Sequence, residues 1–181
     1  MSLLAGAAAE LAGVAAAFDE AALDPVVDAI AGARRVMAYG CGREGLMMRA
    51  LAMRLFHLGV DVSMQGDMTA PPLGPGDLFL CAAGPGELST GSALCGVATA
   101  AGARVLVITA EPDGPTARMA DDRLVIPAQT MARDVGGDSV LPMGSLFEGA
   151  MFLVFEVLVL RLRDRLGETP GSMRARHTNM E

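Results

Sequence analysis

The sequence predicts a three-layer α/β fold built on a doubly wound parallel sheet. Short strand-like runs alternate with longer stretches of helical spacing. The strand-like runs are almost continuously apolar, as in parallel strands that are covered on both faces. The length of 181 residues suits one domain with short extensions. We therefore expect a single domain over 1–181, with a helical segment over 1–33 and a tail over 167–181.

The segment before the first predicted strand is rich in Ala and lacks strand formers. We expect a helix over 3–31 with a break near Asp24 and Pro25, because Asp caps helices and Pro fits the first helical position. The first strand is predicted over 35–39, where a short apolar run ends at a glycine. Helical spacing follows over 44–58 and also stops at a glycine.

The later segments continue the alternation. The run 104–109 is the clearest strand, because its aliphatic and β-branched residues are continuous. The polar tail over 167–181 has too few apolar residues to fold alone, so we expect it to dock on another subunit. The other predicted segments are strands over 60–64, 77–82 and 123–126, helices over 87–101, 115–120 and 144–166, and irregular stretches over 70–76 and 128–141.

Composition excludes several classes of function. All fourteen basic residues are Arg, so Schiff-base catalysis and a Walker A phosphate loop, which need a Lys amine, are excluded. The net charge of −7 argues against nucleic acid as a partner, because phosphate backbones need a basic surface. The three cysteines fit no metal spacing, which favours reduced thiols, a cytoplasmic location and no metal. Neither apolar stretch, 3–17 or 149–160, predicts a signal peptide or a membrane span.

The turn after the first predicted strand has a Gly-rich pattern. Residues 40–45 read Gly-Cys-Gly-Arg-Glu-Gly, which matches G-x-G-x-x-G between a strand and a helix. This pattern is typical of dinucleotide binding, but the second strand ends at Met64 and Gln65 without the acidic residue that binds a ribose. The alternative is a tight turn that packs the helix against the sheet.

Six segments in order carry a family-specific pattern. They are 40–46 (GCGREGL), 52–59 (AMRLFHLG), 71–77 (PPLGPGD), 84–87 (GPGE), 142–148 (PMGSLFE) and 176–181 (RHTNME). Together they resemble sugar isomerase (SIS) domains, specifically the 6-phospho-3-hexuloisomerases. The resemblance implies a flavodoxin-like sheet of five parallel strands and a homotetramer. It also implies the interconversion of a 3-ketohexose 6-phosphate and fructose 6-phosphate through an enediol, with no cofactor.

The resemblance also implies roles for particular residues. Glu148 matches the family's carboxylate and is the candidate base, and His177 is a candidate acid that reaches a neighbouring subunit. His57 matches the family's helix-terminal His, and Arg43 is positioned to orient phosphate or sugar oxygens. The alternatives are a helix-start role for Glu148, a helix-end role for His57, and an ion pair between Arg43 and Glu44. The candidate substrate-binding residues are Gly42, Arg43, Glu44, Gly84, Gly86, Glu87, Ser89 and Thr90.

Three loops depart from the family pattern. The usual S-G-S-G-E-T is Ala-Gly-Pro-Gly-Glu-Leu over 83–88, Glu44 replaces a serine, and two further hydroxyls are lost within 66–71. Six hydroxyl positions have therefore changed, and Glu44 adds repulsion toward a phosphate. Ser89 and Thr90 could partly replace the lost groups. We expect a sugar-phosphate isomerase with altered ligand preference, for example toward a less anionic or amine-bearing sugar derivative. The alternative is a non-catalytic sugar-derivative sensor.

Overall fold

The computed structural model describes residues 2–134 and 139–180. Its centre is a five-stranded sheet in the order β2-β1-β3-β4-β5, and every pair of neighbouring strands is parallel. This confirms the predicted doubly wound α/β class. The strands are β1 (Val36–Gly40), β2 (Val62–Met64), β3 (Leu78–Ala82), β4 (Arg104–Thr109) and β5 (Asp122–Val125).

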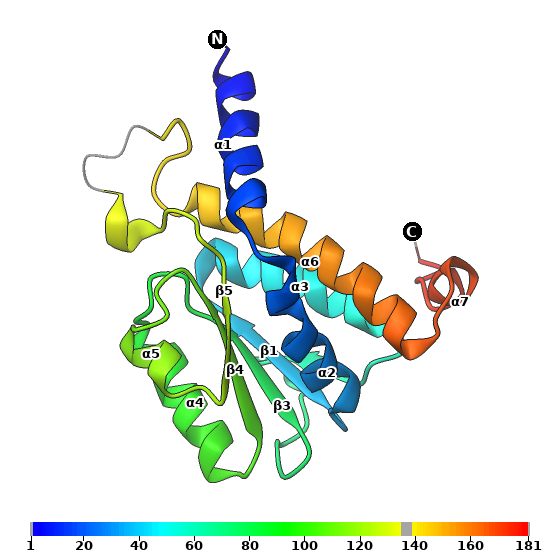
Figure 1. The fold of residues 1–181 in the computed structure, drawn as a ribbon. Helices are drawn as coiled ribbons and strands as arrows, with labels where there is room; N and C mark the ends of the chain where they lie inside the picture. The colour runs from blue at the N-terminus through cyan, green and yellow to red at the C-terminus, as the bar shows by residue number, and fades with distance from the viewer. Residues whose placement is uncertain (1, 135–138, 181) are drawn as a thin grey trace.

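The side chains of β3 alternate between two hydrophobic clusters. Leu78 and Leu80 belong to the larger cluster, whereas Phe79 and Cys81 belong to the smaller one, and all of them are buried. Helices therefore cover both faces of the sheet (Figure 1). The larger cluster contains residues of α2 (Asp24–Gly32), α3 (Gly42–His57) and α6 (Ser145–Leu166), and the smaller one contains residues of α4 (Ser89–Ala100) and α5 (Pro115–Arg118).

Strand order reverses between β1 and β3, which places a crevice at their carboxyl ends. From β1 the chain continues through α3 to the edge strand β2, whereas from β3 it continues through α4 to β4 on the other side. The last residues of the two strands, Gly40 and Ala82, are direct partners in the sheet. The loops that follow them therefore start side by side, at the position where doubly wound folds bind ligands.

The N-terminal helical region differs from the prediction. The predicted boundary at Asp24 and Pro25 is present, because α2 starts there with the proline in its first positions, but α1 (Leu3–Ala17) already ends before Phe18, and a short 3-10 helix, η1 (Glu20–Leu23), lies between them. The cause is Asp19, whose carboxylate accepts a hydrogen bond from the Ala21 N–H at 3.0 Å and starts a new turn. The N-terminal part of α1 projects away from the sheet (Figure 1).

The C-terminal region contains the long predicted helix and a tail with structure of its own. In α6, Phe147, Met151 and Leu158 are buried against the sheet. Within the part of the chain described, no helix combines the length and apolar character needed to cross a membrane. The described part of the tail forms α7 (Pro170–Ala175) and bonds to its own chain, and its expected docking on another subunit stays a prediction.

The stretch over 128–141 is irregular, as predicted, apart from one short element. That element is the 3-10 helix η2 (Met131–Arg133), which starts after Thr130. The Thr130 hydroxyl accepts a hydrogen bond from the Ala132 N–H at 3.3 Å. Residues 135–138 of this predicted stretch lie outside the described residues.

Candidate active site

The Gly-rich turn joins β1 to α3 through a close contact between two glycines. A Cβ atom on Gly45 would lie 2.5 Å from the Gly40 carbonyl oxygen, which is closer than real Cβ atoms approach. Gly42 has a φ of 52°, in the left-handed region that favours glycine. This geometry fits the interpretation of residues 40–45 as a tight turn. It starts α3 directly beyond the end of β1 and carries Arg43 and Glu44 into the crevice.

The carboxylate of Glu44 bridges the two loops of the crevice. Its Oε2 accepts a hydrogen bond from the Gly84 N–H at 2.9 Å. A Cβ atom on Gly84 would lie 2.6 Å from Glu44 Oε1 and 2.7 Å from Cε1 of Phe147, so position 84 accepts only glycine without rearrangement. Burial raises the pKa of Glu44 to about 7, partly opposed by the Gly84 hydrogen bond and reinforced by repulsion from Glu148.

The rest of the loop after β3 is held by bonds within the protein. The Gly86 N–H donates to the Ala83 carbonyl at 2.9 Å, and the Leu88 N–H donates to the Thr116 hydroxyl at 3.0 Å. Pro85 has no N–H to offer. The loop therefore presents few backbone donors before α4 begins, and α4 has no side-chain cap of its own at that end.

Glu148 lies in the first turn of α6 and pairs with Arg43 across the crevice. Nη2 of Arg43 lies 2.6 Å from Oε2 of Glu148 and also donates to the Ser145 hydroxyl at 2.8 Å. The expected alternative, a pair between Arg43 and Glu44, is therefore replaced by a pair with Glu148. Only 16% of the Glu148 side chain is exposed, whereas 55% of the Arg43 side chain is exposed.

Glu148 also borders a cleft of about 440 Å³ that opens to solvent between α1, α3 and α6. Most of the cleft wall is apolar, and Arg43, Ser145 and Glu148 supply its polar groups. A carboxylate in this setting has solvent on one side and a guanidinium on the other. The arrangement can hold an anionic or hydroxylated ligand and present a carboxyl group to it as a base. The apolar residues of the wall are Leu11, Leu46, Met47, Gly149, Phe152 and Leu153.

The two histidines lie together at the opposite end of α3. The ring centroids of His57 and His177 are 5.3 Å apart. Since α3 has 16 residues, it separates them from its own start by about 24 Å. Within one chain, these histidines therefore lie far from Glu148. They line a second cleft of about 320 Å³ with Arg54, Glu156, Val159, Leu160, Arg163, Pro170, Met173 and Arg174.

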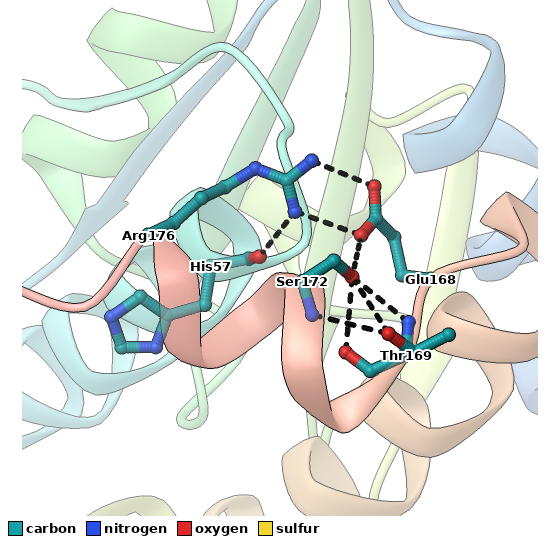
Figure 2. A network of polar contacts seen from close by, with 5 residues as sticks. All are labelled: His57, Glu168, Thr169, Ser172 and Arg176. Atoms are coloured by element: carbon teal, nitrogen blue, oxygen red, sulfur yellow. Dashed lines mark hydrogen bonds and ion pairs between the residues drawn. The ribbon is translucent and has the colours of Figure 1, made fainter.

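Arg176 connects the tail to His57 through hydrogen bonds. Its guanidinium donates to both oxygens of Glu168 at 2.8 Å each and to the backbone carbonyl of His57 at 2.9 Å (Figure 2). The Arg176 hydrogen bonds, with a further one from Ser172, lower the pKa of Glu168 to about 2. In the predicted tail motif, Arg176 thus anchors α7, and the next residue is His177.

The candidate binding residues at the start of α4 lie beside the Gly-rich turn. Glu87, Ser89 and Thr90 are exposed there. The hydroxyl of Tyr39 lies 3.0 Å from the Cys41 sulfur. Burial and this contact raise the pKa of Tyr39 to about 12, while a hydrogen bond with Thr90 opposes the rise. The structure thus brings all eight candidate binding residues to the carboxyl ends of β1 and β3.

Comparison with known proteins identifies the family. A SIS domain model matches residues 29–148, well over half of the chain. The chain belongs to the SIS domain family. This membership favours the tight-turn interpretation of residues 40–45 over dinucleotide binding.

Relatives extend the SIS similarity over nearly the whole chain. The 3-hexulose-6-phosphate isomerase of Mycobacterium gastri is 37% identical over 172 residues, which are 95% of this chain and 86% of that one. The enzyme of the same name from Methylomonas aminofaciens is 35% identical and covers 87% of each chain. A Methanococcus jannaschii protein, whose crystal structure infers a molecular function of 3-hexulose-6-phosphate isomerase, has a TM-score of 0.84, 24% identity and coverage of 98% of both chains. That last likeness shows the fold alone.

In this SIS domain, two threonines that the sequence analysis missed support the loop after β3. The buried hydroxyl of Thr109 donates to the Gly84 carbonyl at 3.3 Å and accepts from the Glu111 N–H at 2.9 Å. Thr116, also buried, accepts from Leu88. Thr109 could have been predicted as a support of the site, because it is the last residue of a β-strand whose carboxyl end faces the crevice. The two buried threonine hydroxyls thus hold the backbone of this loop in place.

Proposed function

We propose that this SIS domain interconverts a 3-ketohexose 6-phosphate and fructose 6-phosphate, or a close analogue of these sugars. The observation that carries the proposal is the Glu148 carboxylate, which is mostly buried, paired with Arg43 at 2.6 Å and open to the cleft between α1, α3 and α6. Support also comes from relatives named 3-hexulose-6-phosphate isomerase that are 30–37% identical over most of both chains.

The proposed step moves one proton between adjacent carbons. Glu148 removes the proton from the hydroxyl-bearing carbon next to the carbonyl, and the carbonyl oxygen takes a proton from an acid, which gives an enediol. Glu148 then returns its proton to the former carbonyl carbon, while the neighbouring hydroxyl loses its proton and becomes the new carbonyl. Arg43 holds the base in place, because its guanidinium bonds to the carboxylate and to Ser145.

Deuterium uptake tests this role. Fructose 6-phosphate incubated with the protein in D₂O should gain deuterium at the carbon next to its carbonyl, as followed by NMR. Glu148→Gln should slow this uptake about 10²–10⁴-fold, the usual contribution of a general base. Asp164→Asn is the matched control, since Asp164 lies on the same helix and pairs with Arg163 at the surface. Unchanged uptake in Glu148→Gln would refute the assignment.

We further propose that the acid comes from another copy of the chain, through the His57–His177 pair. Support comes from the length of α3, which keeps these rings far from Glu148 of their own chain. Mixed oligomers test this. Glu148→Gln and His177→Asn subunits, each inactive alone, should regain activity when coexpressed, because some sites then combine two intact residues. Activity no higher than that of either parent oligomer would contradict the shared site.

We propose a cytoplasmic homotetramer. In support, apolar side chains on α1, α3 and α6 remain exposed, including Leu4 at 82%, Phe56 at 55% and Phe152 at 51%. Light scattering coupled to size-exclusion chromatography measures the mass. Phe152→Glu should dissociate the oligomer if α6 lies in an interface, whereas Met68→Glu, on an exposed loop, should not. A monomeric wild-type protein would refute the proposal.

A further inference from the structure

Glu44 occupies a backbone donor at which an anionic ligand would bind. The Gly84 N–H is the second amide beyond β3, on the loop that starts beside the end of β1. It points at Oε2 of Glu44 at 2.9 Å. The ring of Phe147 and the carboxylate of Glu44 both lie within 3 Å of the position that a Cβ atom on Gly84 would take, so this glycine is closely packed.

The backbone at residues 85, 86 and 88 does not substitute for this donor. The Gly86 N–H donates to the Ala83 carbonyl, the Leu88 N–H donates to Thr116, and Pro85 has none. A ligand anion seated over this loop would therefore share Gly84 with a carboxylate. Two negative charges at one N–H donor repel each other, so either the ligand or the carboxylate must lose its bond or its charge.

The surroundings of Glu44 oppose its ionised form. Glu148 faces it from α6, and the Cys81 thiol faces it from β3. Arg43, the cation next to it in the chain, pairs with Glu148 instead. The Gly84 N–H is thus the group that stabilises the Glu44 charge, and a ligand that takes this donor removes that stabilisation. Binding of an anion should consequently favour the protonated carboxyl.

We propose that Glu44 is a proton-dependent competitor for the ligand's anionic group: ionised, it holds the Gly84 amide and repels that group, and protonated, it remains only a neutral acceptor and no longer repels the group. This rests on the proposed function, in which the anionic group is the phosphate of the substrate. Glu44 thereby sets how strongly this SIS domain selects phosphorylated over uncharged sugars, and it makes that selectivity depend on pH.

The size of the effect follows from the fraction of protein that is competent to bind. With a pKa of about 7, Glu44 is about three-quarters protonated at pH 6.5 and about one-tenth protonated at pH 8. The apparent Kd for a phosphosugar should therefore be about eightfold weaker at pH 8 than at pH 6.5. Removing the charge should strengthen binding at pH 8 about tenfold.

Calorimetry with fructose 6-phosphate at pH 6.5 and pH 8 tests the proposal. Glu44→Gln should bind tightly at both pH values, and Glu44→Ser, which restores the usual family residue, should behave in the same way. Asp113→Asn is the control, because it removes an exposed charge from the loop after β4 without touching Gly84 and should keep the wild-type pH dependence. Equal pH dependence in Glu44→Gln and the wild type, or weaker binding in Glu44→Gln at both pH values, would overturn the proposal.

A second readout does not depend on the substrate. The Gly84 amide resonance in the unliganded protein should titrate with a midpoint near pH 7, and this titration should vanish in Glu44→Gln. Saturating inorganic sulfate, whose charge is constant over this range, should move the midpoint upward. If fructose 6-phosphate binds no variant, the proposed function fails, and the sulfate titration still decides the role of Glu44: an unmoved midpoint refutes it.

Discussion

Replacing Glu44 by Gln should stabilise the protein at pH 8 much more than at pH 5. The pKa of Glu44 rises from 4.5 to about 7 on folding, chiefly because the carboxylate is buried. A folded state with a raised carboxyl pKa binds its proton more tightly than the unfolded chain. The contribution of Glu44 to the free energy of unfolding is therefore fully present below pH 4.5 and is lost as pH rises through about 7. Gln keeps the size and an oxygen acceptor for Gly84 but carries no charge.

The expected magnitude follows from the same values. Each pH unit between the two pKa values lowers the free energy of unfolding by about 1.36 kcal/mol, which gives a total of about 3 kcal/mol. About 2.5 kcal/mol of this total is lost between pH 5 and pH 8. The melting temperature of Glu44→Gln should thus gain about 5–10 °C more over the wild type at pH 8 than at pH 5.

Thermal and urea denaturation at the two pH values measure this difference. Asp113→Asn is the control, because Asp113 is an exposed carboxylate on the loop after β4 and its loss should change stability equally at both pH values. If Glu44→Gln changed the free energy of unfolding equally at pH 5 and pH 8, burial would not raise the pKa of this carboxyl, and the reasoning would be refuted.

Three further predictions concern the supports of the site. Gly84→Ala should destabilise the protein by about 1–3 kcal/mol, because the added methyl meets Glu44 and Phe147; an unchanged urea midpoint would contradict this. Thr109→Val should cost about 1–3 kcal/mol by removing the hydroxyl that bonds Gly84 and Glu111, and Thr109→Ser should recover most of it. Arg176→Ala should release α7, seen as faster amide exchange over 170–175, whereas Arg174→Ala, an exposed neighbour, should not.

The sheet could be predicted well because its strands are short, continuous apolar runs. The strand Arg104–Thr109 has the predicted bounds, and α6 starts one residue after its prediction. The break after α1 was missed because Phe18 and Asp19 contain neither Pro nor Gly. In this Ala-rich segment, the capping ability of Asp19 was the one indication of a break after α1. The Asp24–Pro25 pair is a stronger helix-start signal and was preferred.

The candidate site was predicted in part. The alternation of strands and the Gly-rich turn indicated the two loops that the structure places side by side, since both follow from local patterns. The Glu44–Gly84 bond could not be predicted, because it joins residues 40 positions apart whose distance depends on how α3 packs against β3. The same reason applies to the His57–His177 contact, which depends on where Arg176 holds the tail.

The contact between Gly40 and Gly45 limits how this site can be redesigned. Neither position accepts a side chain, and the left-handed backbone at Gly42 disfavours one there. Half of the six-residue turn is thus committed to backbone geometry. A mutational library aimed at new ligands should therefore vary Cys41, Arg43 and Glu44 alone, a space of about 8,000 protein sequences (from twenty residues at three positions) that one selection experiment can cover completely.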